Sequence, residues 1–304
     1  MIARNGTVGL IGLGIMGSAI ARNLIAKGTA VKGYDIDASR LALLRADGGE
    51  ACGSAAAAAE DVALLLTSLP SVGALDSTVE SLLAAGRRDL VLAELSTLPI
   101  PAKEQARDRL GRAAVEMLDC PLSGTGAQAA TGDLAVYASG PRPAYDAAEP
   151  FFLRFARASH FLGDFGNGSK MKFVANLLVA IHNVASAEAM VLGMKAGLDP
   201  AMIVEVIASG AGTSRVFELR APLMAEAAYR PATMKIEIWQ KDMAIITDFA
   251  QKLGVATPTF TATAPVYDAA LKAGLGGDDT AAVCAVIETR AGLTPNARPG
   301  GDRG

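Results

Sequence analysis

Short apolar runs alternate with helix-forming segments along the first half of the chain. Strands are predicted at residues 7–11, 30–34, 62–67, 90–94, 114–118, 134–138 and 159–162, and segments typical of helices separate most of them. Such alternation is typical of a mainly parallel sheet with helices on both faces. We therefore expect a doubly wound α/β domain, the Rossmann arrangement, over residues 1–165.

The pattern changes near residue 166. From there to residue 290 the sequence predicts no convincing strand, only long helical segments separated by breaks at residues 197–200, 209–212 and 274–278. We expect an all-α second domain over residues 166–290, joined to the first by a long helix that begins near Ser169. The polar, glycine-rich end of the chain, residues 291–304, is expected to be frayed.

Charge and composition narrow the possible partners. The 28 basic and 31 acidic residues leave a net charge of -3, so no general basic field favours nucleic acid. The most apolar stretch, residues 173–192, contains Asn176, His182, Asn183 and Glu188, which indicates a buried helix instead of a membrane span. The three cysteines lie far apart and fit no disulfide or metal pattern, so we expect a cytoplasmic protein without a metal site.

A glycine-rich segment follows the first predicted strand and opens the first predicted helix. Gly12, Gly14 and Gly17 fit the pattern G-x-G-x-x-G, which allows a tight turn, close approach of a pyrophosphate, and close helix–strand packing. The phosphates of a dinucleotide then lie on free N–H groups of the helix N-terminus. The residues expected to contact the cofactor are Gly12, Leu13, Gly14, Ile15, Met16 and Gly17.

An acidic residue ends the second predicted strand. Asp35 lies 18 positions after Gly17, where a carboxylate accepts hydrogen bonds from the adenosine ribose hydroxyls. Because it would repel the 2′-phosphate of NADP, the sequence favours NAD, with NADP still possible because the nearby Arg40 is able to accommodate that phosphate. The alternative is that Asp35 only caps a helix or a turn.

With these motifs the chain resembles the β-hydroxyacid dehydrogenase family. That family includes 3-hydroxyisobutyrate dehydrogenase and the tartronate semialdehyde, glyoxylate and succinic semialdehyde reductases. The resemblance covers residues 7–290. The family's GxGxMGxxxAxNL motif is matched over residues 12–24, and its DxPVSGG motif appears as DCPLSGT over residues 119–125. Its GxGxxxKxxxN segment is matched over residues 166–176.

The resemblance implies an NAD(P)-dependent enzyme that interconverts a short-chain hydroxy acid and its semialdehyde or oxo acid. It places further cofactor contacts at Leu69 and Pro70, at Thr97 of a Ser-Thr loop, and at Lys241 of a Lys-Asp pair. For Lys241 the alternative is a surface salt bridge with Asp242. The resemblance also implies a small carboxylate-bearing substrate and a homodimer or homotetramer formed through the helical domain.

The chemistry of such a reaction agrees with the matched residues. Lys172 and Asn176 are four positions apart on a predicted helix and so lie on one face, where Lys172 is expected to act as general acid/base. Asn183 lies on the same face, and it either contacts substrate or packs against another helix. Ser123 and Gly124 are expected to hold the carboxylate, and Thr125 stands beside them where the family usually has glycine.

Two other functions are consistent with this architecture. One is an imine reductase-like oxidoreductase, and the other is a dinucleotide-binding module without catalysis. In imine reductases the lysine position typically carries another residue, and loss of the lysine would support a binding module, so the presence of Lys172 argues against both. Only two histidines are present, which discourages a histidine-dependent dehydrogenase.

Overall fold

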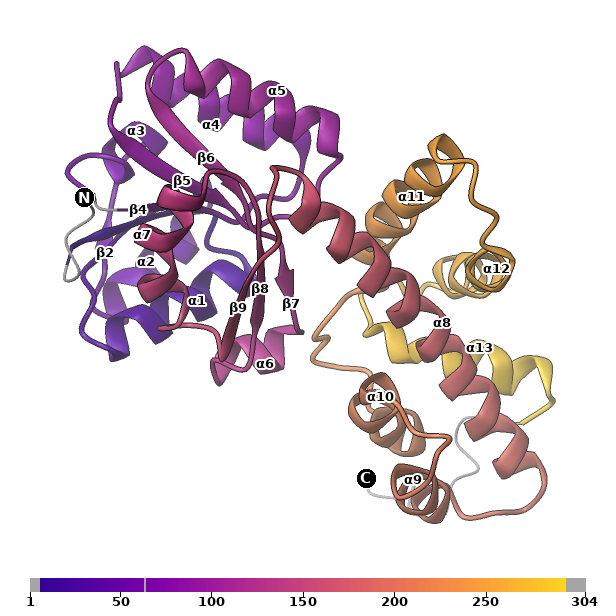
Figure 1. Cartoon of the computed structure of the whole chain (residues 1–304). Coiled ribbons are helices and arrows are strands. Elements are labelled where there is room, and N and C mark those ends of the chain that lie inside the picture. Colours follow the sequence, from indigo (N-terminus) through magenta and orange to yellow (C-terminus); the bar gives the residue numbers. More distant parts are fainter. Residues whose placement is uncertain (1–5, 63, 294–304) are drawn as a thin grey trace. The chain divides into compact units, whose positions relative to one another are not determined.

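The computed structural model describes residues 6–62 and 64–293, and the chain divides into two compact units, Met1–Lys172 and Phe173–Gly304 (Figure 1). The expected boundary at residue 165 precedes the division because the long helix α8 (Asn167–Lys195) begins within the first unit. Its first turn is hydrogen-bonded to Ser139 and Asp119 of that unit. Residues 294–304 of the tail that was expected to fray lie outside the described residues.

The first unit is built on a six-stranded sheet in which every neighbouring pair is parallel. Its strand order is β3-β2-β1-β4-β5-β6, so the order reverses between β1 and β4. The strands are β1 (Val8–Ile11), β2 (Val31–Tyr34), β3 (Glu50–Ala51), β4 (Leu64–Thr67), β5 (Leu90–Glu94) and β6 (Val115–Asp119). The predicted doubly wound arrangement is confirmed, and β3 is the strand that the sequence did not predict, because two residues show no alternation.

Helices cover both faces of this sheet. The core on one face contains residues of α1 (Ile15–Ala26), α2 (Ala38–Ala46) and α7 (Arg142–Phe152). The core on the other face contains residues of α3 (Ala55–Ala58), α4 (Val72–Ala84) and α5 (Ile100–Gly111). Alternate residues of each strand therefore enter different cores.

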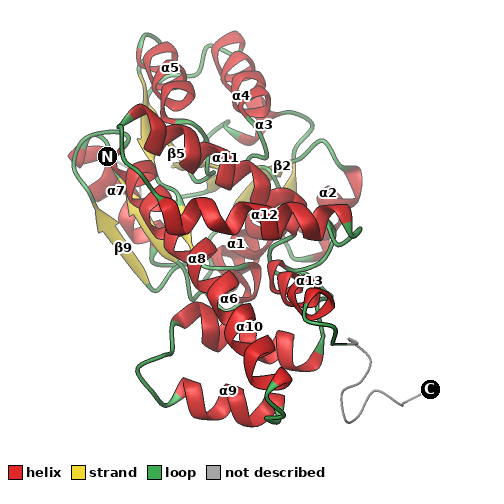
Figure 2. Ribbon diagram, turned by 90° about the vertical axis from the view of Figure 1, so that its right-hand side faces the viewer, coloured by secondary structure: helices red, strands yellow, loops and turns green. Residues whose placement is uncertain are grey.

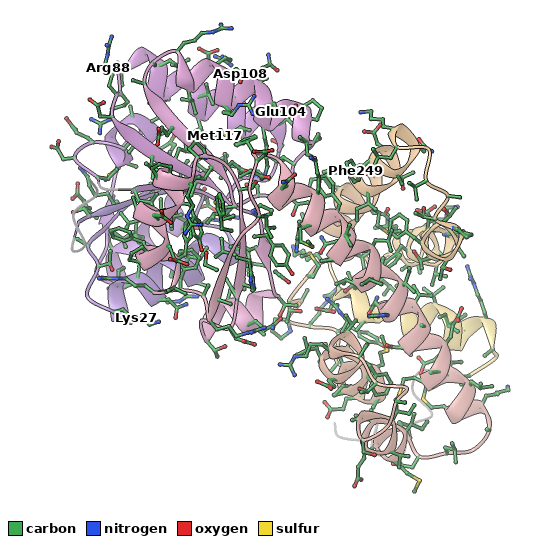
Figure 3. The ribbon with its side chains drawn as sticks, viewed as in Figure 1. Lys27, Arg88, Glu104, Asp108, Met117 and Phe249 are labelled. Atoms are coloured by element: carbon green, nitrogen blue, oxygen red, sulfur yellow. The ribbon has the colours of Figure 1, made fainter. Side chains whose placement is uncertain are left out.

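The buried strand β4 illustrates this alternation. Leu64 and Leu66 pack toward α1, whereas Leu65 packs toward α4. Figure 3 shows Met117 inside the unit and the charged side chains of Lys27, Arg88 and Asp108 at its outside.

A second, three-stranded sheet completes the first unit. It contains β7 (Leu122–Ser123), β8 (Ala135–Ala138) and β9 (Ala158–Phe161), with β7 antiparallel and β9 parallel to β8, and α6 (Gly126–Ala130) lies between β7 and β8 in the chain. The strands predicted at residues 134–138 and 159–162 exist but belong to this separate sheet. Within the described residues, an isolated antiparallel bridge between Asp119 and Ser139 links the end of β6 to the residue after β8, and β8 pairs with β7 and β9 instead of extending the large sheet.

The second unit is helical over the residues that the structure describes (Figure 2), as predicted. After α8 it contains α9 (Pro200–Ala208), α10 (Arg215–Glu226), α11 (Ile236–Lys252), α12 (Pro258–Lys272), a 3-10 turn (Thr280–Ala282) and α13 (Val283–Arg290). Among the described helices, α8 alone is long and apolar enough to cross a membrane by length and composition. However, its polar residues Asn176 and Asn183 are buried and hydrogen-bonded within the unit, as in the core helix of a soluble protein.

A buried carboxylate ties the loop before α11 to the turn before α13. Asp279 is fully buried and pairs with Arg220 at 2.5 Å. It also accepts hydrogen bonds from the backbone N–H groups of Thr233, Met234 and Ala281. Burial acts to raise the pKa of Asp279, but Arg220 and these donors outweigh it and hold the pKa below its usual value.

We predict that Asp279→Asn destabilises the protein by about 3 kcal/mol at neutral pH, because it leaves the buried Arg220 without its counter-ion. The ionised carboxylate stabilises the fold fully above the usual pKa of 3.8, and this contribution is lost as pH falls through the lower folded-state value. We therefore expect the difference in free energy of unfolding between wild type and Asp279→Asn, measured by urea unfolding, to become smaller below pH 3.8.

Asp278→Asn is the matched control. Its partner Arg230 has a side chain that is 75% exposed, so we expect a change of less than about 1 kcal/mol. A difference for Asp279→Asn that does not vary with pH would contradict this account of the carboxylate.

Candidate active site

The glycine-rich loop between β1 and α1 has the geometry of a phosphate cradle. Gly12 has φ +89°, and a Cβ there would lie 2.2 Å from the Ser68 carbonyl oxygen. A Cβ on Gly17 would lie 1.9 Å from the Gly12 carbonyl oxygen, whereas a Cβ on Gly14 would meet only Arg40, at 3.5 Å. Gly14 therefore leaves open space beside the N-terminus of α1, which no side chain caps in the described part of the chain. These features fit a bound pyrophosphate.

Asp35 lies directly beside this loop. Its carboxylate accepts hydrogen bonds from the Leu13 N–H at 2.7 Å and the Asp37 N–H at 2.9 Å, and Arg40 Nη1 lies 3.3 Å away. The residue that caps the next helix is Asp37, which accepts from the Ser39 N–H. Asp35 thus holds the loop in place at the carboxyl end of β2, where a ribose is bound in this fold.

Two further loops leave the same edge of the sheet, after β4 and β5. The Leu69 N–H donates to Ser96 Oγ at 2.7 Å, which joins the predicted Leu-Pro and Ser-Thr loops. The Leu69 side chain is buried in the core, while Pro70 is exposed and Thr97 is half-buried. Ligands bind at the carboxyl edge of such sheets, where the strand order reverses. Here that point lies between β1 and β4.

A charged cluster that the sequence did not reveal lies at the ends of β5 and β6. Lys103 of α5 is fully buried, and its Nζ lies 2.6 Å from Glu94 Oε2 and 2.7 Å from Asp119 Oδ1. The same Nζ donates to the Ser96 carbonyl oxygen at 2.7 Å. Burial alone would lower the pKa of Lys103, but the carboxylates of Asp119 and Glu94 outweigh it and raise the pKa, so the side chain is ionised.

Asp119 also contacts the start of α8. Its Oδ2 accepts from the Ser169 N–H and its Oδ1 accepts from Ser169 Oγ, each at 2.7 Å. The neighbouring Cys120 is buried, and burial raises the pKa of its thiol, which makes it a poor nucleophile. The contacts described for Asp119 and Lys103 are all with other residues of the protein, and none of them places either residue against a substrate.

The predicted carboxylate-binding segment joins β7 to α6. Ser123 is half-buried at the end of β7, and Gly124 has φ +134° with no room for a Cβ, which would lie 2.5 Å from Leu134 Cδ2. The Thr125 N–H donates to Gln128 Oε1 at 3.1 Å, so this N–H already has a partner within the protein. Thr125 thus begins α6 as its N-cap residue, in a capping box with Gln128.

The second unit brings Asn176 together with the Lys-Asp pair of α11. Asn176 is buried, and its Nδ2 donates to Asp242 Oδ2 at 2.9 Å. Lys241 Nζ lies 3.6 Å from Asp242 Oδ1, and its side chain is 33% exposed. Lys172, which is half-buried, is four positions before Asn176 on the continuous helix α8.

Asn183 has the contacts of a helix-packing residue. Its Nδ2 donates to the hydroxyl oxygen of Tyr267 and to the carbonyl oxygen of Thr280, each at 2.9 Å, and the residue is 1% exposed. Burial raises the pKa of Tyr267 to about 12, so its hydroxyl stays neutral. These contacts favour the helix-packing alternative for Asn183, and its contact with substrate stays a prediction.

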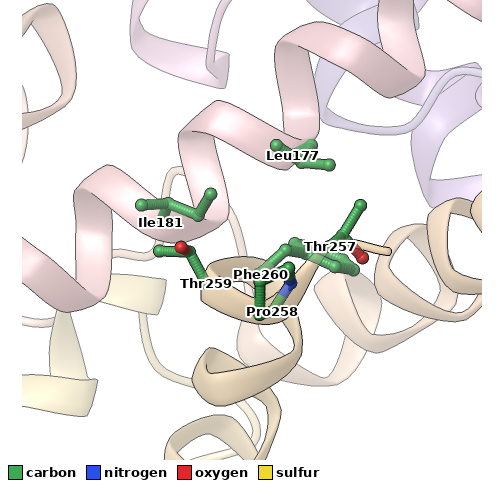
Figure 4. Close-up of a pocket in the computed structure, with 6 residues that line it drawn as sticks. All are labelled: Leu177, Ile181, Thr257, Pro258, Thr259 and Phe260. Carbon is green, nitrogen blue, oxygen red and sulfur yellow. The ribbon is translucent and has the colours of Figure 1, made fainter. Parts of the chain in front are cut away.

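A small apolar hollow lies in the second unit. Leu177 and Ile181 of α8 line one side of it, and residues 257–260 at the start of α12 line the other (Figure 4). The volume of this hollow is about 160 Å³. Its lining contains no charged side chain and none of the predicted site residues. In residues 6–62 and 64–293, no three His, Cys, Asp or Glu side chains gather in a way that could hold a metal ion.

Comparisons with known proteins agree with the loop geometry. Residues 7–163 match the family model for the NAD binding domain of 6-phosphogluconate dehydrogenase. Residues 166–287 match the model described as NAD-binding of NADP-dependent 3-hydroxyisobutyrate dehydrogenase. Together the two matched segments extend through both units.

Among curated relatives, L-threonate dehydrogenase of Cupriavidus necator is 32% identical, over 92% of this chain and 95% of that protein. Glyoxylate/succinic semialdehyde reductase 2 of Arabidopsis thaliana is 28% identical, over 93% of this chain and 79% of that protein. Imine reductases, such as one from Pseudomonas sp. at 19% identity and a TM-score of 0.60, share the fold alone.

A solved structure of 3-hydroxyisobutyrate dehydrogenase from Salmonella typhimurium superposes with a TM-score of 0.83 at 28% identity, covering 92% of this chain and 99% of that chain. The family models, the relatives and this structure agree with one another and with the dinucleotide cradle. The chain therefore belongs to the β-hydroxyacid dehydrogenase family of NAD(P)-dependent oxidoreductases that act on small hydroxy acids.

Proposed function

We propose that the protein is an NAD-preferring dehydrogenase or reductase of a short hydroxy acid and its semialdehyde or oxo acid, with Lys172 as the general acid/base. The observation that carries this proposal is the pairing of a dinucleotide cradle at Gly12–Gly17 with a lysine and a buried asparagine one helical turn apart on α8. A binding module without catalysis requires only the cradle.

The cofactor is held by residues at the carboxyl edge of the large sheet. The open backbone at Gly14 and the N-terminus of α1 receive the pyrophosphate, and Asp35 accepts from the ribose hydroxyls. Leu69, Pro70 and Thr97 border the nicotinamide end through their loops, and Lys241 adds a further cofactor contact. When bound, the nicotinamide supplies or accepts the hydride.

Lys172 moves the proton that accompanies the hydride. In the direction of reduction its ammonium donates a proton to the carbonyl oxygen as that oxygen becomes an alkoxide, and in oxidation its amine accepts the proton. The buried Asp242 accepts the Asn176 amide N–H, so the Asn176 carbonyl oxygen must point elsewhere, because a carboxylate accepts but does not donate. That oxygen is an acceptor that suits the ammonium of Lys172 or the substrate hydroxyl.

The substrate carboxylate is anchored by the segment after β7. The Ser123 hydroxyl and the Gly124 N–H supply donors to it. The Thr125 N–H is already bound to Gln128, and the Thr125 side chain adds bulk and a hydroxyl beside the anion. A threonine here favours a substrate with a hydroxyl near the carboxylate, and threonate, the substrate named for several relatives, is such a compound.

The assay of choice measures NADH and NADPH oxidation with glyoxylate, tartronate semialdehyde, methylmalonate semialdehyde and succinic semialdehyde, and NAD reduction with L-threonate. We predict that Lys172→Ala lowers kcat about 10² to 10⁴-fold while the cofactor still binds, because only the proton transfer is lost. The exposed Lys170 donates to Asn167 Oδ1 at 3.0 Å, and Lys170→Ala is the matched control, with wild-type turnover expected.

Turnover that persists in Lys172→Ala would remove this residue from the mechanism. Bound cofactor with no turnover on any of these substrates would instead favour the binding module.

The preference for NAD rests on Asp35. We predict that Asp35→Ser shifts the ratio of kcat/KM with NADH to kcat/KM with NADPH toward NADPH by at least about tenfold, because repulsion of the 2′-phosphate is removed and Arg40 is released to bind it. Asp37→Ser is the control, since Asp37 is exposed and serine also caps helices. An unchanged ratio in Asp35→Ser would show that Asp35 does not contact the ribose.

A further inference from the structure

The cluster of Glu94, Lys103 and Asp119 contributes no group to the proposed chemistry, yet it is fully buried. Removing three charged groups from water is costly, and buried ion pairs are often no more stabilising than apolar residues of the same size. Stability alone is therefore a weak reason for such a cluster. The hydrogen bonds that the cluster makes with the start of α8 indicate another role.

Asp119 uses all of its acceptor positions. Its Oδ1 accepts from Lys103 Nζ and Ser169 Oγ, and its Oδ2 accepts from the Ser169 N–H and, at 3.3 Å, from Ser139 Oγ. A carboxylate has about four lone-pair sites, so these four donors fill them. Ser139 Oγ in turn accepts from the Gly168 N–H at 2.9 Å. Four donors that converge on one carboxylate fix its orientation.

These contacts complete the N-terminus of α8. The first four N–H groups of a helix have no partner within it. Here the Asn167 N–H donates to the Asp164 carbonyl oxygen, and the Lys170 N–H donates to the Gly166 carbonyl oxygen. The Gly168 N–H donates to Ser139 Oγ, and the Ser169 N–H donates to Asp119 Oδ2. The backbone is also pressed against the sheet, since a Cβ on Gly168 would lie 2.3 Å from the Tyr137 carbonyl oxygen.

Lys172 follows this anchored turn directly. It is three residues after Ser169, a rise of about 4.5 Å and nearly one turn along the helix. Any rotation or shift of the first turn of α8 therefore moves the Lys172 side chain. Because Lys103 holds the Asp119 carboxylate in place and Asp119 in turn binds Ser169, the charged cluster determines where that turn begins.

We propose that Asp119, acting through Ser169 and held by Lys103, is a positioning residue that sets the placement of the Lys172 ammonium. The proposal rests on the proposed role of Lys172 as general acid/base. The cluster also reaches the loops expected to border the cofactor, because Lys103 donates to the Ser96 carbonyl oxygen and Ser96 accepts from the Leu69 N–H. One buried group thus links those loops to the start of the helix that carries Lys172.

Ser169→Ala tests the proposal with the smallest change, since it removes the hydroxyl and keeps the N–H bond to Asp119. Ser186→Ala is the matched control, because Ser186 is also a buried serine of α8 and donates only to the carbonyl oxygen of its own helix. We expect Ser169→Ala to lower kcat about 10- to 100-fold with the substrate KM and the cofactor Kd unchanged. Ser186→Ala should retain wild-type kcat.

A double variant separates positioning from structural damage. If Ser169 acts only through Lys172, adding Ser169→Ala to Lys172→Ala causes no further loss of the residual turnover. Thermal melting of each variant confirms that it is folded. Equal kcat for Ser169→Ala and Ser186→Ala, or losses that multiply in the double variant, would overturn the positioning role while leaving the role of Lys172 intact. Wild-type turnover in Lys172→Ala alone would instead reject the proposed function, and the positioning role with it.

Discussion

A single buried ammonium organises the carboxyl edge of the large sheet. Lys103 reaches from α5 into a space between the ends of β5 and β6, where Glu94 and Asp119 would otherwise repel each other. With Lys103 present, the Glu94 carboxylate is free to hold the Ser96 N–H, and Asp119 is free to hold the first turn of α8. The position of the loops after β4 and β5 and of the start of α8 therefore depends on this charge balance.

The proposed function draws on residues of both units. The first supplies the glycine cradle, Asp35 and the loops after β4 and β5, all at one edge of a parallel sheet. The second supplies a buried amide whose orientation is fixed by Asp242. Helix α8 belongs to both, since it begins within the first unit and carries Asn176 into the second.

The sequence predicted those features that depend on local pattern. The alternation of apolar runs predicted the doubly wound sheet, and the spacing of Gly12, Gly14 and Gly17 predicted the cradle. The short strands β3 and β7 were not predicted, since two residues carry no periodicity. Asn183 stayed ambiguous because a helical face does not reveal which element packs against it, and the contact with Tyr267 comes from 84 residues away.

The charged cluster was missed for a different reason. Lys103 begins the segment KEQARDR, which has the polar composition of an exposed helix surface. Its partners lie 9 and 16 residues away on two different strands, so only the tertiary fold brings the three charges together. The signal present in the sequence was an acidic residue at the end of each of two apolar strands, Glu94 and Asp119, where a buried carboxylate requires a cation nearby.

Amide hydrogen exchange of Lys103→Met, compared with wild type, tests the organising role of this cluster most directly. We predict faster exchange at Leu69, Ser96, Gly168 and Ser169 together, because the N–H groups of these residues are the ones that the cluster holds directly or through one serine. Strand β1 should keep its protection, since its hydrogen bonds to β2 and β4 do not involve the cluster. Unchanged exchange at the four amides, or a uniform increase across the whole unit, would contradict the account.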